Sequence, residues 1–246
     1  MQELDSLFLN RYSRKALNRS RFQRHSRCVP FMLPDFKATV VLATWDWSRA
    51  AALASAIGPV SKGEICLPGL WDKPKLETHN FSDPALDGET FQQNARLSSL
   101  HYASQIGQPV LSENYGLVVN ALNGEPGTQS HCYGYPDAVT WRERAALVVG
   151  KMKGIRDRRA ALCLALCLAV PGRFDTLHWE GCLTGEIARK VNSKGYAYDS
   201  IFYIKELGKT LDELHPYEKE EYSCWRKCVE ALRSDYPKIR EFLGIN

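Results

Sequence analysis

Apolar residues recur along the chain with two periods, which predicts strands alternating with helices. The run ATVVLAT at 38–44 is apolar and β-branched, which is typical of a buried strand. The alanine-rich segment WDWSRAAALASAIG then predicts a helix that ends at Gly58. The segment 89–107, ETFQQNARLSSLHYASQIG, predicts a second helix with an apolar stripe and with Gly107 as its C-cap.

The remainder of the chain adds strands and two helices. PVLSEN and GLVVNAL predict a strand, a turn and a strand within 109–122, and Trp141–Met152 predicts a helix. Two long antiparallel strands, Ala160–Val170 and Arg173–Arg189, are joined by the turn signal PGR. A short strand at 199–204 and a helix at 217–236 close the chain. We therefore expect an α/β fold, an elongated mixed β-sheet with flanking helices and two lobes around a central nucleotide cleft.

Composition is that of a soluble globular protein. Hydrophobic residues make up 44% of the 246 residues and charged residues 24%. The longest apolar run, Ala160–Val170, is shorter than the roughly 20 residues that cross a bilayer, so we expect no membrane association. The start of the chain is polar, and its cysteines form no C-x-x-C pair. We expect reduced thiols in a cytoplasmic protein, with zinc binding by Cys224 and Cys228 a minor alternative.

Positive charge is concentrated near the N-terminus. Residues 1–33 hold seven arginines and lysines against two acidic residues, a net charge of +5, whereas the whole chain carries +4. We therefore divide the chain into a basic N-terminal extension, 1–37, and a folded domain, 38–246. Such an extension could bind nucleic acid or an acidic surface, although a solvated or docked segment is the more frequent explanation.

The predicted turn at Ser112–Gly116 carries candidate chemistry. Glu113 and Asn114 follow the apolar run PVL, and a carboxylate at the end of a strand is a common place to hold a metal ion or activate a water. The same letters before a glycine are more often an ordinary polar turn. The residues alone leave both interpretations open.

Five segments in order resemble the inosine triphosphate pyrophosphatase family: VLAT, TFQQNARL, PVLSENYGLVVNALNGEPG, KGYAYDSIF and YEKEEYSCWR. The resemblance covers about residues 38–246. It implies hydrolysis of non-standard purine nucleoside triphosphates to the monophosphate and pyrophosphate, with Mg²⁺ as the cofactor and a homodimer as the assembly.

The resemblance also implies a set of site residues, several of which differ from the family pattern. Asp46 and Arg49 stand where the family has asparagine and lysine in its phosphate loop, whereas Thr44 is retained. The implied magnesium ligands are Gln93, Glu113 and Asn114, where the family has a glutamate and paired aspartates. The implied catalytic residues are Glu113, Asn114 and Asp46. The implied substrate-binding residues are Thr44, Arg49, Asn94, Tyr115, Tyr196, Tyr198, Asp199, Lys219, Ser223 and Arg226.

These differences have a chemical consequence. Gln93 and Asn114 are neutral, so two negative charges are missing where Mg²⁺ would bind, and an amide does not take a proton from water at neutral pH. Four hypotheses follow. The protein is a pyrophosphatase with a relocated metal site, a catalytically silent nucleotide-binding or scaffold protein, an enzyme of another type that uses His131, Cys132 or Cys224, or a domain tethered to nucleic acid by its basic extension.

Overall fold

The computed structural model describes residues 37–44, 53–54, 57–62, 64–70, 82–192 and 197–245. The chain divides into two units, 1–34 and 35–246, and the described residues all belong to the second. Residues 1–36 of the basic extension, Asp46, Arg49 and Tyr196 lie outside the described residues, so the roles expected of them stay predictions.

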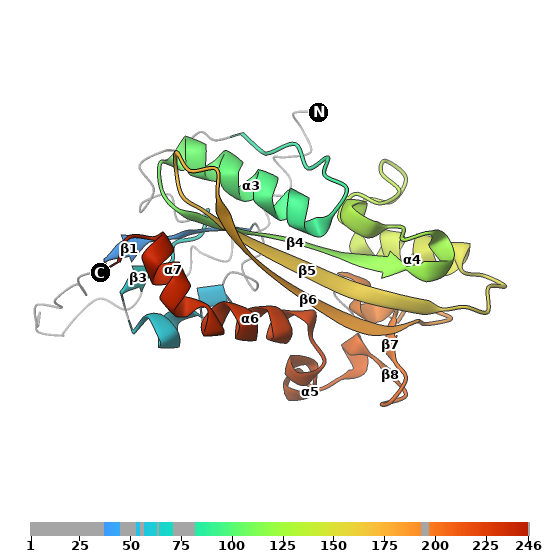
Figure 1. The fold of residues 1–246 in the computed structure, drawn as a ribbon. Coiled ribbons are helices and arrows are strands. Elements are labelled where there is room, and N and C mark those ends of the chain that lie inside the picture. The colour runs from blue at the N-terminus through green and yellow to red at the C-terminus, as the bar shows by residue number, and fades with distance from the viewer. Residues whose placement is uncertain are drawn as a thin grey trace, which may run out of the picture. The chain divides into compact units, whose positions relative to one another are not determined.

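A mixed six-stranded sheet forms the centre of the domain (Figure 1). Its strand order is β2-β4-β5-β6-β7-β8; β2 and β4 are parallel, and the other neighbours are antiparallel. The strands are β2 Val41–Ala43, β4 Val110–Val119, β5 Arg159–Ala169, β6 Thr176–Ile187, β7 Phe202–Ile204 and β8 Lys209–Thr210. A second, parallel pair joins β1 Ala38–Thr39 to β3 Ile65–Cys66.

Helices cover both faces of the sheet, with α3 on one face and α6 on the other (Figure 1). The helices are α3 Phe91–Ile106, α4 Trp141–Lys151, α5 Pro216–Glu221, α6 Cys224–Ser234 and α7 Tyr236–Phe242. Short 3-10 turns span Asn120–Leu122, Gly127–Gln129, Ala197–Ser200 and Leu211–Glu213. The predicted mixed α/β fold with flanking helices is confirmed.

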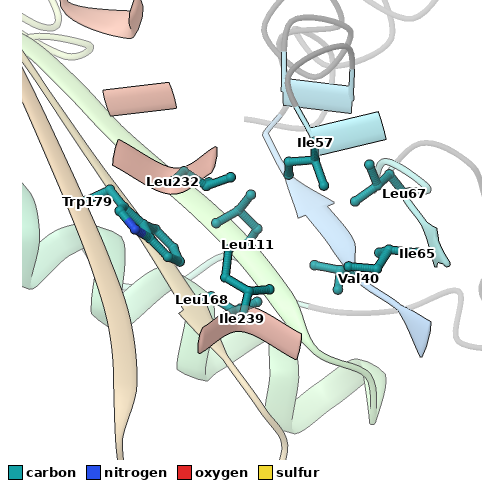
Figure 2. A pocket seen from close by; sticks show the side chains of 9 residues that line it. All are labelled: Val40, Ile57, Ile65, Leu67, Leu111, Leu168, Trp179, Leu232 and Ile239. Atoms are coloured by element: carbon teal, nitrogen blue, oxygen red, sulfur yellow. The ribbon is translucent and has the colours of Figure 1, made fainter. Parts of the chain in front are cut away.

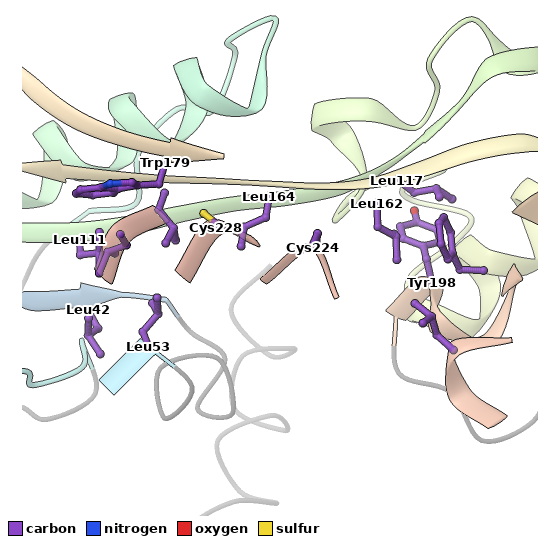
Figure 3. Close-up of a cluster of buried hydrophobic side chains, with 14 of the residues drawn as sticks. Leu42, Leu53, Leu111, Leu117, Leu162, Leu164, Trp179, Tyr198, Cys224 and Cys228 are labelled. Atoms are coloured by element: carbon purple, nitrogen blue, oxygen red, sulfur yellow. The ribbon is translucent and has the colours of Figure 1, made fainter. Parts of the chain in front are cut away.

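The period of two along the strands divides the core between the two faces. Leu162, Leu164 and Leu166 of β5 join the main hydrophobic cluster, which also takes in Cys224 and Cys228 of α6 (Figure 3). The intervening residues Ala165 and Cys167 pack against Ala95 of α3. Because both faces of the central strands are covered, β5 is apolar almost throughout, as its sequence suggested.

Several predicted boundaries are wrong; for example, the strand predicted at 199–204 begins only at Phe202, after a 3-10 turn. No turn interrupts 109–122: β4 continues through Glu113–Tyr115, which pair with Leu166–Leu164 of β5. The helix predicted at 217–236 is broken at Ser223, whose extended backbone (φ −142°, ψ 132°) caps a new helix, α6. Helical residues also continue past Gly58 to Ser61. Gly107 is confirmed as the C-cap of α3, with φ 71°.

A small cavity lies within the main core, in the part formed by the β1–β3 pair, α6 and α7 (Figure 2). Its volume of about 20 Å³ admits roughly one water molecule. The lining is wholly apolar: Val40, Ile57, Ile65, Leu67, Leu111, Leu168, Trp179, Leu232 and Ile239. A space of this size and polarity cannot receive a nucleotide, so the candidate site lies elsewhere. Within the described residues, no helix combines the length and apolar character that a membrane span requires.

Candidate active site

The candidate site begins where the short strand β2 ends beside β4. The parallel register pairs Ala43 with Ser112, so the next residue of each strand, Thr44 and Glu113, come together. The Thr44 hydroxyl donates a hydrogen bond of 2.8 Å to Glu113 Oε1. Thr44 is buried and Glu113 is half-buried. The structure thus places one predicted carboxylate in a sheltered, polar position at the carboxyl end of a parallel strand pair.

Glu113 and its neighbour Asn114 point to opposite faces of the sheet. Leu111 and Leu117, which share the parity of Glu113, belong to the main core on the α6 side. Asn114 pairs with Ala165, which packs under α3, and its side chain is only 7% exposed. These two adjacent residues therefore occupy separate environments, Glu113 on the α6 side of the sheet and Asn114 on the α3 side.

A patch of buried polar atoms lies between α3 and β4. Asn94, in the first turn of α3, is fully buried, and its Oδ1 accepts a 2.8 Å hydrogen bond from Gly88 N. A Cβ at Gly88 would lie 2.7 Å from that oxygen, so glycine is needed for the contact. Among the described residues, no hydrogen-bond partner is found for Asn94 Nδ2, Ser112 Oγ or Asn114 Oδ1. These groups are neutral and can orient or hydrogen-bond a ligand, but they cannot act as a base at neutral pH.

The Gln93 side chain caps the start of α3 rather than binding a ligand. Its Oε1 accepts hydrogen bonds from Glu89 N (2.7 Å) and Thr90 N (3.2 Å), while Thr90 Oγ1 accepts one from Gln93 N (3.1 Å). This is a capping box, which satisfies backbone donors that a helix start leaves open. The oxygen that a cation would need is already engaged.

The three predicted magnesium ligands do not converge in this arrangement. The Gln93 oxygen caps a helix, and Glu113 and Asn114 lie on opposite faces of β4. Across the described ranges, no group of three or more His, Cys, Asp or Glu side chains is placed to hold a metal ion. Mg²⁺ requires hard oxygen ligands in near-octahedral geometry, and this ligand set does not supply them.

Tyr198, predicted to receive the base, is part of the core. It is fully buried, and its hydroxyl donates a 2.8 Å hydrogen bond to Ser130 O. Its ring meets Trp141 edge to face, with centroids 5.6 Å apart. Burial raises the pKa of the Tyr198 phenol. Because the ring is fully buried in the core, it has no free face for stacking.

Arg144 is a charged residue of this region that the sequence interpretation missed. Its guanidinium carbon lies 5.1 Å from the centroid of the Trp141 ring, one turn earlier on α4. Its Nε is buried and has no hydrogen-bond partner among the described residues. Burial and the nearby charge of Arg144 lower the pKa of His131. The i, i+3 spacing of Trp141 and Arg144 was the available signal, and the unused donor makes Arg144 a candidate anion-binding residue.

Four other predicted residues, Asp199, Lys219, Ser223 and Arg226, make polar contacts within the protein. Lys219 Nζ lies 3.2 Å from Asp199 Oδ2, a contact that the sequence did not predict. Ser223 caps α6 by accepting a 3.1 Å hydrogen bond from Trp225 N. Arg226 pairs with Glu230 along the exposed side of α6, at 2.9 Å.

Comparison with known proteins gives consistent matches. The Ham1 family model matches residues 65–235. A dITP/XTP pyrophosphatase of Thermus thermophilus is 33% identical over 201 residues, which cover 80% of this chain and 91% of that protein. The structure is similar to a HAM1 protein from Coxiella burnetii (TM-score 0.72, 29% identity, 82% of this chain and 99% of that one). It is also similar to the Staphylococcus aureus Ham1 protein (TM-score 0.70, 26% identity, 81% and 98%).

Proposed function

Because this chain belongs to the Ham1 family, we propose that it is a nucleoside triphosphate pyrophosphatase acting on non-standard purine nucleotides such as dITP and XTP. It would release pyrophosphate and leave the nucleoside monophosphate. The observation that carries the proposal is the Thr44–Glu113 hydrogen bond, which holds a carboxylate at the carboxyl end of the β2–β4 pair. Ligands of α/β folds commonly bind at such strand ends.

In this proposal Glu113 is the proton acceptor. Its carboxylate would take a proton from the water that attacks the phosphate chain, since the neighbouring amide of Asn114 cannot. Thr44 would hold the carboxylate in place by its hydrogen bond to Oε1. Asn94 of α3 and Asn114 of β4 are buried on the other face of the sheet, where they would support β4 without carrying charge.

Cationic side chains would hold the triphosphate. Lys219 is kept in position by Asp199, and Arg144 retains a buried nitrogen without a partner among the described residues. Arginine binds phosphate through a planar fork of donors, and lysine binds it as a compact charge. The family resemblance adds Arg49 to the proposal as a substrate-binding residue and Asp46 as a catalytic residue.

The alternative function is nucleotide binding without turnover. Two features favour it: the Gln93 oxygen is used in a helix cap, and the residue at position 114 is neutral. A protein of this kind would act as a sensor or scaffold.

Product analysis separates the two functions. The protein would be incubated with dITP, XTP and GTP, with and without Mg²⁺, and monophosphate and pyrophosphate would be quantified by chromatography. The proposal expects equal amounts of the two products from dITP or XTP, reduced by about 10²–10⁴-fold in Glu113→Gln. The exposed Glu206→Gln is the matched control. Thermal stabilisation by the nucleotides without any product would establish the alternative.

Three wider expectations stay predictions of the sequence: a homodimer, a cytoplasmic location and nucleic-acid binding by the basic extension. Light scattering on the purified chain measures the oligomeric state, and imaging of a tagged chain reports its location. A salt-dependent gel shift that disappears on deletion of 1–33 would support nucleic-acid binding, and no shift at low salt would exclude it.

A further inference from the structure

Cys163 and Cys182 face each other across the two longest strands of the sheet. They are direct partners in the β5–β6 register, and their sulfur atoms are 2.8 Å apart. Both are free thiols; Cys182 is exposed and Cys163 is half-buried. By contrast, Cys167 on the same face of β5 is buried under α3, where the Ser99 hydroxyl donates to its sulfur.

The hydrogen-bond pattern shows which kind of cross-strand pair they form. Ile187 N donates to Arg158 O across the strands, and the register continues unbroken from Arg159↔Glu186 to Ala169↔Thr176. In an antiparallel ladder, hydrogen-bonded and non-hydrogen-bonded pairs alternate. Cys182 lies an odd number of residues from Ile187, so Cys163 and Cys182 are a non-hydrogen-bonded pair.

The contact of Lys227 with β6 supports the assignment of Cys163 and Cys182 as a non-hydrogen-bonded pair. Its Nζ lies 3.5 Å from Cys182 O, so that carbonyl is turned away from β5. Among the described residues, β7 pairs with β6 only at Glu186 and Ile187, which leaves the edge of β6 open at Cys182. Non-hydrogen-bonded partners have Cα atoms about 4.5 Å apart, at the short end of the roughly 4.4–6.8 Å range that a disulfide spans.

We propose that Cys163 and Cys182 form a dithiol modification site that low-molecular-weight disulfides, such as glutathione disulfide, oxidise to an intrachain disulfide. Because Cys182 is exposed, reducing thiols can reach the bond, which makes the modification reversible. The site is independent of the proposed hydrolysis, because neither thiol takes part in it.

Because Cys182 is exposed and Cys163 is half-buried, Cys182 reacts first. The Cys182 thiol loses its proton and attacks one sulfur of glutathione disulfide, forming a mixed disulfide and releasing one glutathione, which takes up a proton. Cys163 then loses its proton and attacks the Cys182 sulfur, which releases the second glutathione. Two protein thiols are oxidised, and one small disulfide is reduced to two thiols. Burial raises the pKa of Cys163, so the buried thiol suits the second, intramolecular step.

The test is peptide mapping by mass spectrometry after incubation of the folded full chain with glutathione disulfide. We expect a peptide that links Cys163 to Cys182 and is lighter by two hydrogen atoms, and dithiothreitol should restore the separate peptides. Cys163→Ser should trap a stable glutathione adduct on Cys182. Cys182→Ser should form neither product at this site. Cys132→Ser, which removes a half-buried thiol outside the pair, should behave as the wild type.

The proposal would be overturned if the wild type accumulated the Cys182 adduct without the cross-link, or if neither cysteine reacted. Circular dichroism on each variant would establish that the fold is intact. A dithiol-specific trivalent arsenical gives a second readout: it should bind the reduced wild type and Cys132→Ser, but neither variant of the pair. Equal binding by all four proteins would also refute the site.

Discussion

The Thr44 hydroxyl donates a hydrogen bond of 2.8 Å to Glu113 Oε1, across a separation of 69 residues in the chain. The contact exists because β2 ends one residue before Thr44 while β4, its parallel neighbour, runs on. A hydroxyl and a carboxylate are thereby sheltered at one point of the sheet edge. Charge-assisted hydrogen bonds of this kind are stronger than neutral ones.

Replacing Thr44 by Val keeps the side-chain shape and removes this donor. We expect a loss of about 1–3 kcal/mol in the free energy of unfolding, because a half-buried carboxylate loses a hydrogen bond. Urea denaturation measures it, and Thr44→Ser, which retains the hydroxyl, is the control. No loss of stability in Thr44→Val would contradict the contribution assigned to the hydroxyl.

Asn114→Asp would introduce a carboxylate into a site that is 7% exposed and faces α3. Burial disfavours the charged form, so the pKa of the new group should be higher in the folded state than in the unfolded chain. Stability should then fall as the pH rises from about 4 through the raised pKa, and be about 1–3 kcal/mol below wild type at neutral pH. Urea denaturation at several pH values tests this, and a variant as stable as wild type at neutral pH would contradict it.

Gly116 is required by close approach rather than by a turn. A Cβ there would lie 2.5 Å from Ser130 Oγ, 2.6 Å from Gly127 O and 2.7 Å from Phe91 Cε1. We expect Gly116→Ala to lower stability by about 1–3 kcal/mol through overpacking. Gly58, a helical glycine with no atom within 4 Å of an added Cβ, supplies the control. Gly58→Ala should instead raise stability by about 0.4–1 kcal/mol, and both are read from thermal or urea unfolding.

The lowered pKa of His131 predicts a pH dependence of stability. Burial and the charge of Arg144 disfavour protonation in the folded state, so between the lowered pKa and the ordinary value of 6.5 the unfolded chain binds more protons. The stability that His131 contributes in this way is fully present above pH 6.5, and it is lost as the pH falls towards the lowered pKa of His131 in the folded state. His178, whose pKa burial and Arg96 also lower, contributes in the same direction.

Two variants isolate His131 from that background. His131→Gln should lose less stability than wild type between pH 7 and pH 5. Arg144→Met should raise the pKa of His131 partway towards its ordinary value, since burial remains; NMR titration of the imidazole protons measures this directly. An unchanged titration in Arg144→Met would place the whole effect in burial.

Much of the fold followed from periodicity. The leucine-rich run of β5, the segment that forms β6 and the turn between them were predicted because two extended segments that flank a proline–glycine turn admit few other pairings. The turn predicted at Ser112–Gly116 failed for a physical reason. Consecutive polar residues are typical of a turn, but here Glu113 is half-buried beside Thr44 and Asn114 is buried on the α3 side of the sheet.

The candidate site was less accessible to sequence reasoning. The capping role of Gln93 was visible as the signature T-x-x-Q at Thr90–Gln93 and was overlooked in favour of a ligand role. The i, i+3 spacing of Trp141 and Arg144 was visible in the sequence, but the proximity of Arg144 to His131 was not, because it depends on how α4 meets the loop after β4. The burial of Tyr198 likewise depends on Trp141, which lies 57 positions earlier in the sequence.

Strand β6 and helix α6 touch main chain to main chain at Gly181, where an added Cβ would lie 2.1 Å from Cys224 O. No side chain lies between the two backbones at that point, so any residue larger than glycine at 181 would push β6 and α6 apart. Cys182 is the next residue of β6, and Cys224 follows the Ser223 cap of α6. The glycine thus fixes how closely the strand that carries the exposed thiol packs against the helix.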